Sequence, residues 1–553
     1  MQPPNEPTTN RAPYKRYDPS FRLTRTIDLQ FLGACHSMAL FPWDYHSIET
    51  LWSGAMNQPE IRKGWEPMVD SWLGAIIIGG TDAVAVWPAK GSVGGFCLRI
   101  PGNGASQGRF SAVAWALSNE APLEPLMICS RGSILYVLNV NKKQVVSQLR
   151  GHGGEITSIA VHPSFPYLVC TCSKDFSARI YDLTMPPRDR PNNPHWPPST
   201  LPSLGGAPHG LQPSEPEGIG IGRCVIVLCG GPSGGHDAAV LGAAFHPSYP
   251  LIATCGMDRA VKIWRLPRMS FDKLAREDKP LFSSTRIHKA RILSVNWLSL
   301  DVLATSSAPA LMRSNNNPDD LYFEDGTFAI WRWLGFDRFF PDDRPKPAKV
   351  MRGCASDYQE SSINLTASFK ILSVVSTPRS TRHLHIAQTH TNDYVIAVTL
   401  PDRMCFHNVS NLEPRKPPGF PLDQESVNSL KSKLHLDDED DEELSPGPTT
   451  NAQSLPLGGW REIFVPNLTG DTLQACTIGF YGLLLCILDN KGREILAFEK
   501  SNSGLCKIDQ KGMGYETPYS LLIVKLDAQN TSEWLSTNEK RIIYHHLFDH
   551  PPE

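Results

Sequence analysis

Histidine, serine and aspartate, the side chains that act as base, nucleophile and acid in many enzymes, recur at matching positions in this chain. His152 is followed by Ser173 and Asp175, and His236 is followed at nearly the same spacing by Asp258. A group that occurs twice in similar surroundings is typical of a structural repeat. We therefore expect these side chains to be buried and hydrogen-bonded within a scaffold, and to be neither catalysts nor ligands.

The segments around these residues repeat as well. His-Pro-Ser-Phe-Pro at 162–166 matches His-Pro-Ser-Tyr-Pro at 246–250, and each segment is preceded by a Gly-His pair. The two copies begin 84 residues apart, but a Pro-rich stretch lies between them. The underlying period is thus about 40 to 45 residues, which is typical of one blade of a WD40 β-propeller.

The residues within each repeat predict short strands. Ile156 to Val161, Tyr167 to Cys172 and Phe176 to Tyr181 are apolar, β-branched runs bounded by Pro, Gly or Asp. Similar runs elsewhere predict an all-β fold, a seven-bladed WD40 β-propeller with long inter-blade insertions. Arg22 to Asp28 is polar and extended, and we expect it to close the ring. The expected blades begin near residues 29, 110, 151, 235, 288, 371 and 472, and the polar insertion from Pro309 to Gly326 in the fifth blade is expected to be a long loop.

Within a blade, we expect the histidine and aspartate to share a hydrogen-bond network with a strand hydroxyl and the ring end of an aromatic residue. Trp264 is the aromatic member in the second unit. Ser173 offers the hydroxyl in the first unit, whereas Gly256 occupies the matching position in the second. The sequence therefore predicts that the second network is incomplete.

Three further motifs resemble sites of chemistry but lack the required surroundings. Gly104 to Gly108 reads Gly-x-Ser-x-Gly, yet it lacks the preceding strand and the following helix of a nucleophile elbow. Gly230 to Gly235 is not followed by Lys-Ser/Thr, so it is not a phosphate-binding loop. His545, His546 and His550 do not have the spacing of zinc ligands. The sequence thus predicts a protein without catalysis, metal or cofactor, which acts by binding.

The composition argues against several other classes of function. A net charge of −3 gives no electrostatic reason to expect binding to a membrane or to a specific DNA sequence. No apolar run approaches the ~20 residues that span a bilayer. The 13 cysteines are irregularly spaced, which suits buried thiols in a reducing compartment. We expect a soluble protein that is not secreted and has no disulfides.

The chain is expected to form one domain with tails. Residues 1–20 are predicted to be a disordered tail, residues 21–500 to form the propeller, and residues 501–553 to be a carboxyl-terminal extension. Two insertions, at 184–222 and 409–457, are rich in Pro and Gly or in acidic residues. Such segments cannot bury enough apolar surface to order themselves, so we expect both insertions to be disordered.

Three groups of residues in the middle of the chain match a known pattern. They lie at 151–153 with 173–175, at 255–258 with 264–265, and at 287–288 with 297–298. These groups resemble the third, fourth and fifth blades of the EED/extra sex combs family, the WD40 subunit of Polycomb repressive complex 2. The resemblance extends from about Phe110 to Ser307 and continues elsewhere only as a blade pattern. The long insertions suit a fungal-type member.

The resemblance implies a nuclear, non-enzymatic scaffold of a histone H3 lysine methyltransferase complex that acts in transcriptional repression. The implied partners are an E(z)-type SET-domain methyltransferase, which lays a helix in a groove on one propeller face, and a VEFS-type zinc-finger subunit. A histone H3 tail is a further implied ligand. The family binds its trimethyl-lysine in an aromatic cage on the opposite face, where cation–π attraction holds the ammonium.

The cage that the resemblance implies is altered in this chain. Ser111 stands where the second blade of the family has the cage tyrosine. The Trp-Tyr pair of the sixth blade falls on Lys370 and Ile371, and a lysine there repels the ligand cation. Phe110 and Phe369 are the candidate methyl-lysine-binding residues if the neighbouring loops shift by one position. A first-blade aromatic residue would join them, and the candidates are Phe31, Phe41 and Trp43.

Two other functions are compatible with the repeats. A generic WD40 assembly scaffold would show the same pattern, because propellers serve many functions. A substrate receptor of a cullin ubiquitin ligase would present an arginine two positions after a blade-ending Trp-Asp. This chain has Thr184 and Pro267 at those positions, so the arginine signal is absent.

Overall fold

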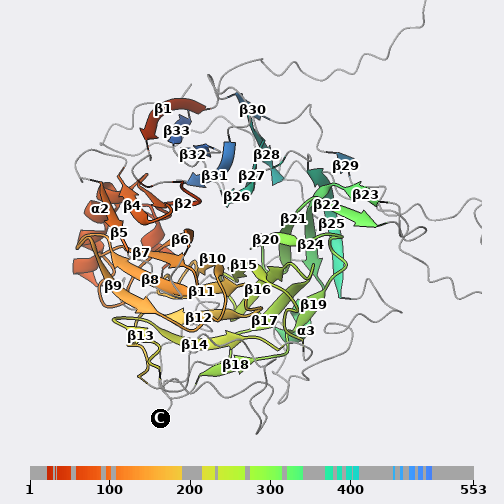
Figure 1. The fold of residues 1–553 in the computed structure, drawn as a ribbon, viewed down its shortest axis with the longest axis horizontal. Coiled ribbons are helices and arrows are strands. Elements are labelled where there is room, and N and C mark those ends of the chain that lie inside the picture. Colours follow the sequence, from red (N-terminus) through yellow and green to blue (C-terminus); the bar gives the residue numbers. More distant parts are fainter. Residues whose placement is uncertain are drawn as a thin grey trace, which may run out of the picture.

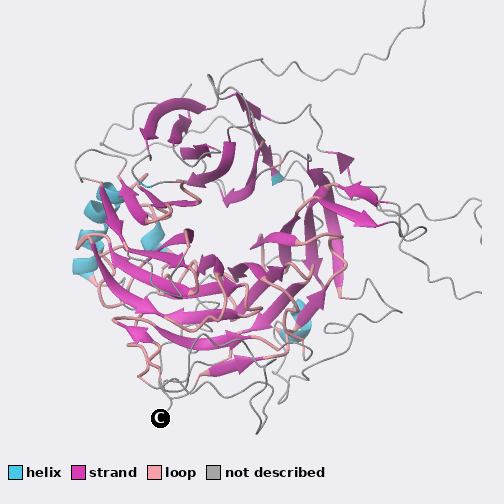
Figure 2. Ribbon diagram, in the orientation of Figure 1, coloured by secondary structure: helices cyan, strands magenta, loops and turns pink. Residues whose placement is uncertain are grey.

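Most of the regular structure in the computed structural model is β-strand, as the short apolar runs predict (Figure 2). Within the described residues, the strands form seven sheets of four or five strands and one two-stranded hairpin. Figure 1 shows the sheets arranged in a ring, which is the architecture of a β-propeller. The structure describes residues 21–28, 32, 34–51, 58–88, 95–100, 108–189, 215–230, 234–267, 274–313, 321–340, 368–377, 381, 383–388, 394–400, 403–409, 453–454, 461–464, 473–479, 484–489 and 494–500.

The first four sheets follow the chain order, each built on four antiparallel strands. The first contains β2 (Ser37–Leu40), β3 (Ile76–Gly79), β4 (Ala83–Trp87) and β5 (Phe96–Arg99). The second contains β6 (Phe110–Ala116), β7 (Leu126–Arg131), β8 (Ile134–Asn139) and β9 (Gln144–Leu149). The third contains β10 (Ile156–Val161), β11 (Leu168–Ser173), β12 (Ala178–Asp182) and β14 (Arg223–Leu228). The fourth contains β15 (Val240–Phe245), β16 (Leu251–Gly256), β17 (Val261–Arg265) and β19 (Phe282–Ser284).

The remaining three sheets complete the ring. The fifth contains β20 (Ile292–Trp297), β21 (Val302–Ser307), β24 (Gly326–Trp333) and β25 (Phe369–Thr377). The sixth contains β26 (His383–Gln388), β27 (Tyr394–Thr399), β28 (Arg403–Asn408) and β30 (Arg461–Phe464). The seventh contains β31 (Leu473–Gly479), β32 (Leu484–Asp489), β33 (Glu494–Lys500) and β1 (Phe21–Asp28).

Strand β1 joins the two ends of the ring. It pairs antiparallel with β33, so that Phe21 lies opposite Lys500 and Asp28 lies opposite Glu494. The first strand of the chain therefore shares a sheet with the last three, and β2 of the first sheet packs beside β31. This pairing confirms the prediction that residues 22–28 close the ring, and it leaves the seventh sheet with an outer strand.

Three insertions add a fifth strand to the outer edge of a sheet. β13 (Gly218–Ile219) pairs with β9, β18 (Ala275–Glu277) pairs with β14, and β29 (Gln453–Ser454) pairs with β25. The prediction that residues 184–222 and 409–457 are disordered is therefore wrong for the parts that form β13 and β29. Glu217 stabilises the segment that leads into β13, because its buried carboxylate accepts hydrogen bonds from the backbone N–H groups of Arg188 and Cys224.

Two other expectations differ from the structure. The segment from Ile371 was expected to open the sixth blade, but β25 pairs with β24 and is the fourth strand of the fifth sheet. The polar insertion after Ser307 was expected to be a loop, but it contains the hairpin of β22 (Ala310–Arg313) and β23 (Leu321–Glu324). Both errors have one cause, since long insertions hide which strands follow each other within a blade.

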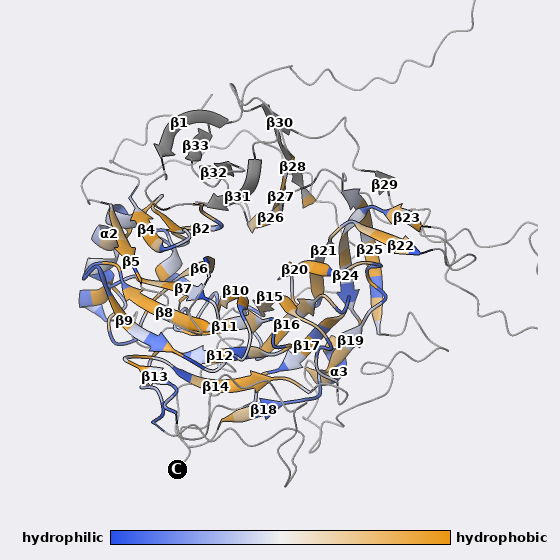
Figure 3. Ribbon diagram, in the orientation of Figure 1, coloured by the Kyte–Doolittle hydropathy of each residue, from blue (hydrophilic) through white to orange (hydrophobic). Residues whose placement is uncertain are grey.

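Apolar strands build the interior of the ring. All residues of β7, β8, β11 and β16 are buried, and Figure 3 shows the hydrophobic colour following strands such as β8 and β14 while the loops are hydrophilic. Burial on both faces explains why these strands read as continuous apolar runs. No helix in the described part of the chain is both long and apolar enough to cross a membrane.

Candidate functional site

The fourth sheet contains a complete hydrogen-bond network. The indole N–H of Trp264 donates to Thr254 Oγ1 over 2.8 Å, and Thr254 Oγ1 lies 2.8 Å from His236 Nε2. His236 Nδ1 lies 2.8 Å from Asp258 Oδ2. Because the threonine oxygen already accepts from the indole, its own proton goes to His236 Nε2, and His236 Nδ1–H donates to the carboxylate. The network links β16, β17 and two turns in a fixed register.

The third sheet contains a related network around His152. His152 Nδ1 lies 2.8 Å from Asp175 Oδ2, and His152 Nε2 lies 2.7 Å from Thr171 Oγ1. Asp175 also accepts hydrogen bonds from the backbone N–H of Gly153 at 3.0 Å and from the hydroxyl of Ser177 at 2.6 Å. A carboxylate with this many donors remains ionised and holds the turn in place.

Threonine hydroxyls, and not the predicted Ser173, bond the histidines of these networks. Ser173 instead donates to the carbonyl of Gly154 and accepts the backbone N–H of Asp175. The threonines that bond the histidines precede each aspartate by four residues, so Gly256 does not interrupt the second network. The prediction of an incomplete second network is wrong. The repeated Thr-to-Asp spacing was the signal that could have identified Thr171 and Thr254.

A third network lies in the fifth sheet and has no carboxylate. His288 Nε2 lies 2.7 Å from Thr305 Oγ1, and His288 Nδ1 lies 2.6 Å from Thr327 Oγ1. Trp331 donates its indole N–H to Thr305 Oγ1 over 3.2 Å. Thr327 thus occupies the place that aspartate has in the other two networks. The repeats did not predict this network, because Thr327 follows the β22–β23 insertion.

Burial sets the protonation of these groups. Desolvation lowers the pKa of His152 and of His236, and it lowers the pKa of His288 to about 3. Although burial opposes it, attraction to His152 and hydrogen bonding hold the pKa of Asp175 below its usual value. The histidines are therefore neutral near pH 7, which agrees with the donor and acceptor order of the hydrogen bonds.

The two His-Pro dipeptides form a second kind of buried contact. His162 Nδ1 accepts the backbone N–H groups of Ser164 and Phe165, both at 3.1 Å. His246 Nδ1 accepts those of Ser248 and Tyr249, both at 3.0 Å. Burial lowers the pKa of His162 to about 3 and that of His246 to about 4. An acceptor nitrogen must be neutral, so these histidines also act as scaffold groups.

These arrangements support structure rather than reaction. The histidines of the three networks are at most 4% exposed, and both ring nitrogens of each have a hydrogen-bond partner within the sheet. No group of three or more His, Cys, Asp or Glu side chains in the described ranges could hold a metal ion. Residues 104–107, 231–233 and 545–550, which carry most of the other three motifs, lie outside the described residues.

A helix that the sequence did not predict lines one side of a hollow on the surface. α2 (Pro59–Trp72) lies between β2 and β3, begins with Pro at its first position, and buries Trp65, Met68, Val69 and Trp72. This spacing of three and four residues places the four side chains on one helical face. The indole N–H of Trp65 donates to the carbonyl of Asp44 over 2.9 Å, which fixes the helix to the preceding segment.

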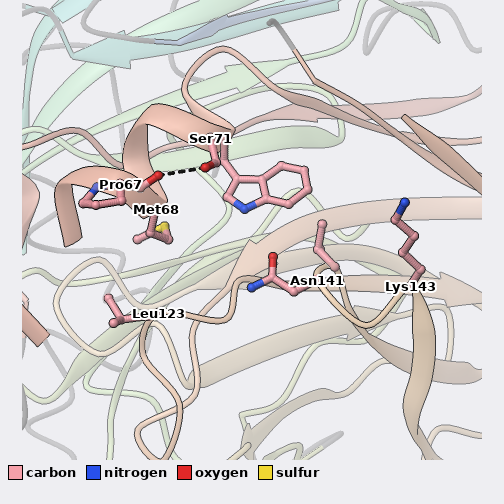
Figure 4. Close-up of a pocket in the computed structure, with 8 residues that line it drawn as sticks. Pro67, Met68, Ser71, Leu123, Asn141 and Lys143 are labelled. Atoms are coloured by element: carbon pink, nitrogen blue, oxygen red, sulfur yellow. Dashed lines mark hydrogen bonds between the residues drawn. The ribbon is translucent and has the colours of Figure 1, made fainter. Parts of the chain in front are cut away.

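A hollow of about 350 Å³ lies between α2 and the second sheet (Figure 4). Pro67, Met68 and Ser71 line its helix side, and Figure 4 shows Leu123, Asn141 and Lys143 on the opposite side. The remaining lining residues are Trp72 and Val140. We call the apolar lining residues Met68, Trp72, Leu123 and Val140 the floor of the hollow, and the exposed polar residues Asn141 and Lys143 its rim.

Three connections that are distant in sequence form this hollow. α2 connects the first two strands of the first sheet, Leu123 lies between β6 and β7, and Lys143 lies in the turn between β8 and β9. In antiparallel sheets these connections emerge at the same end of the strands. We call this side of the ring the helix face and the opposite side, which carries the turns between second and third strands, the turn face.

The structure does not bring the two cage candidates together. Phe110 belongs to β6 of the second sheet, is 0% exposed, and has the Arg131 guanidinium 5.3 Å from its ring centroid. Phe369 belongs to β25 of the fifth sheet and packs against Phe282 and Trp331 at centroid distances of 6.0 and 6.1 Å. Both rings are core residues as placed, and their positions give no support to a methyl-lysine cage. Phe369 was misassigned because β25 is not in the sixth sheet.

Comparison with known proteins agrees with the repeats. The sequence model of the WD domain, G-beta repeat family matches residues 143–182 and 222–265. The Polycomb protein EED of Chaetomium thermophilum is 24% identical over 300 residues, which are 54% of this chain and 42% of that protein. The Polycomb group protein FIE1 of Zea mays is 28% identical over 159 residues, or 28% of this chain and 26% of FIE1. The chain thus spans less than half of the length of these curated relatives.

Solved structures agree on the fold. The Chaetomium thermophilum Polycomb Repressive Complex 2 bound to GSK126 contains a chain that matches with a TM-score of 0.52 at 16% identity, covering 87% of this chain and 98% of that one. The complex with H3K27me3 and H3K27M gives a TM-score of 0.53 at 14% identity, covering 87% and 98%. The chain is thus a β-propeller that carries WD repeats and is similar in sequence to the Polycomb proteins EED and FIE.

Proposed function

We propose that this protein is a non-catalytic scaffold subunit of a Polycomb-type histone H3 lysine methyltransferase complex that acts in the nucleus in transcriptional repression. The observation that carries the proposal is the 24% identity to a Polycomb EED protein over 300 residues. The buried networks support it, because the histidines and aspartates that resemble catalytic groups are fully used within the blades.

The hollow on the helix face is the proposed contact for the catalytic partner. An amphipathic helix of an E(z)-type SET-domain methyltransferase would pack apolar side chains against Leu123, which is half-buried, and Pro67, which is exposed. Its polar side chains would meet the rim formed by Asn141 and Lys143, which are exposed. A VEFS-type zinc-finger subunit is the second proposed partner. Binding of this kind depends on shape and apolar contact and requires no cofactor.

Affinity purification of the full-length protein from nuclei tests the proposal. We expect a SET-domain methyltransferase and a VEFS-type subunit among the recovered proteins. Recovery of a cullin with its adaptor would favour the ubiquitin-ligase alternative instead. Recovery of neither kind of partner, with the propeller folded by circular dichroism, would favour a generic assembly scaffold and contradict the proposal.

Recognition of a methylated histone H3 tail stays a prediction of the family resemblance. Titration of the full-length protein with a trimethyl-lysine H3 peptide and with its unmodified counterpart measures it. Equal affinity for the two peptides would reject a working cage. The scaffold proposal does not depend on the outcome.

A further inference from the structure

The turn face exposes large apolar side chains on consecutive blades. Phe176 follows Asp175 in the turn of the third sheet and is 47% exposed, and Met257 precedes Asp258 in the turn of the fourth sheet and is 48% exposed. Leu293, the second residue of β20 in the fifth sheet, is 45% exposed. The buried networks of His152, His236 and His288 fix the backbone near these positions. The exposed side chains therefore project from an ordered backbone.

The three blades adjoin on this face. The Thr157 hydroxyl of the third sheet donates to the carbonyl of Val240 in the fourth. A Cβ added to Gly242 of the fourth sheet would lie 3.4 Å from the carbonyl oxygen of Leu293 in the fifth. The first strands of the three sheets are thus in direct contact at the ends that lead into the turn face.

In each of the three blades, a cationic residue lies two positions in sequence from the exposed apolar residue. Lys174 lies two residues before Phe176, Arg259 lies two residues after Met257, and Arg291 lies two residues before Leu293. All three cations are exposed. We call these residues the three-blade patch, and its members are Lys174, Phe176, Met257, Arg259, Arg291 and Leu293.

Backbone conformation adds a second observation. Phe176 has φ of +68° and Arg259 has φ of +64°, in the left-handed region that glycine occupies at no steric cost. Neither side chain gains from burial in this position. Both residues directly follow the network aspartate of their blade, so the same turn geometry holds the exposed ring and the exposed guanidinium on this face.

The charge of the patch is mainly positive. Lys174 Nζ lies 2.6 Å from Glu155 Oε2, whereas Arg259 and Arg291 have no ion-pair partner within the described ranges. Other charged groups on these turns include the network carboxylates of Asp175 and Asp258, the exposed Asp237, and Lys289, which pairs with Glu324. Arg259 and Arg291 therefore face solvent beside exposed apolar side chains, with Asp237 and Asp258 as acidic residues close by.

We propose that the three-blade patch binds a segment of a separate protein in which acidic side chains accompany apolar ones. The apolar side chains would cover Phe176, Met257 and Leu293, and the carboxylates would pair with Arg259 and Arg291. Arginine forms bidentate contacts with carboxylates, which gives such a surface selectivity for acidic over basic segments. The site is independent of the hollow on the opposite face.

A labelled peptide in which Asp or Glu alternates with Leu or Phe tests the proposal by fluorescence polarisation with the full-length protein. We expect saturable binding that weakens with added salt, because surface charges are screened. Phe176→Ser and Arg259→Glu should each lower the affinity about tenfold or more. The matched control is Arg265→Glu, which changes an exposed arginine of the same sheet at the opposite end of β17.

Three results of this titration would overturn the proposal. One is the absence of binding by the wild-type protein, and another is equal binding of a peptide with Lys in place of Asp and Glu. The third is an equal loss of affinity in Arg265→Glu. A further variant replaces the seven acidic residues at 437–443 of this chain with Ser and Gly. Tighter peptide binding by that variant would show that the patch is covered by its own chain and would contradict a separate partner.

Discussion

The interior networks and the hollow beside α2 use opposite kinds of side chain. The networks bury polar groups, such as His152 at 1% exposure, and satisfy each of them with a neighbour in the same sheet. The hollow leaves apolar groups of Pro67 and Leu123 accessible between α2 and the second sheet. Residue types that suggest catalysis therefore stabilise this protein, whereas its candidate docking surface is lined mainly by apolar side chains.

The two regions also differ in how changes should act. Removal of a network member leaves a buried polar partner unsatisfied, so stability should fall. A change at the rim of the hollow affects a solvated side chain, so stability should be kept and binding lost. Stability and binding measured on the same variants therefore distinguish the two regions.

Acidification should give the largest effect on stability. Burial lowers the pKa of His162, His246 and His288 to about 3, 4 and 3, whereas an unfolded histidine titrates near 6.5. Below that value the unfolded chain binds more protons, so stability falls as the pH falls. Each histidine costs ~1.4 kcal/mol per pH unit between about pH 6 and pH 5. Urea unfolding at pH 7, 6 and 5 measures the loss, and a flat profile would contradict burial of neutral histidines.

Asp175→Ala should give the next largest effect. The substitution removes the acceptor of His152 Nδ1 and of the Gly153 N–H and Ser177 hydroxyl, and the side chains of His152 and Ser177 are buried. His152 is neutral, so the variant loses hydrogen bonds to a charged acceptor, and each such bond contributes about 1.5–3 kcal/mol. Thermal unfolding measures it, with Asp237→Ala, an exposed aspartate just before the fourth sheet, as the control. Equal melting temperatures for the two variants would show that the network contributes nothing.

Thr254→Val should have a smaller effect. Valine keeps the shape but leaves the indole N–H of Trp264 and His236 Nε2 without the hydroxyl they share. The expected loss is about 2 kcal/mol. Thr254→Ser, which retains the hydroxyl, should stay close to the wild-type protein. If the serine variant loses as much stability as the valine variant, packing rather than hydrogen bonding explains the role of this residue.

The repeats made the propeller predictable, together with the histidine–aspartate pairs of the first two networks and Trp264 of the second. Gly-His, His-Pro and the turn aspartate recur along the chain, so His152 and Asp175, and His236 and Asp258, could be paired from the sequence alone. The hydroxyl partner Thr171 was missed because Ser173 lies nearer to the turn. The difference is one of strand geometry, since a residue two positions along a strand faces the same side and can reach the same histidine.

Other features could not be read from local sequence. β25 follows a long insertion, so nothing in its own residues assigns it to the fifth sheet rather than the sixth. The hollow unites α2, Leu123 and Lys143 from three connections, and no motif marks their proximity. A surface assembled from distant loops becomes visible only after the sheets are placed around the ring.

Binding of the SET-domain subunit by variants of the hollow shows whether the hollow is its docking site. Lys143→Glu and Leu123→Asp change the rim and the floor of the hollow, and Leu300→Asp changes an exposed leucine in the β20–β21 connection of the same face. Co-purification of the coexpressed full-length subunits should fall about tenfold or more for the first two variants and stay unchanged for Leu300→Asp. Wild-type recovery of the SET-domain subunit by folded Lys143→Glu and Leu123→Asp proteins would contradict the assignment of the hollow as its docking site.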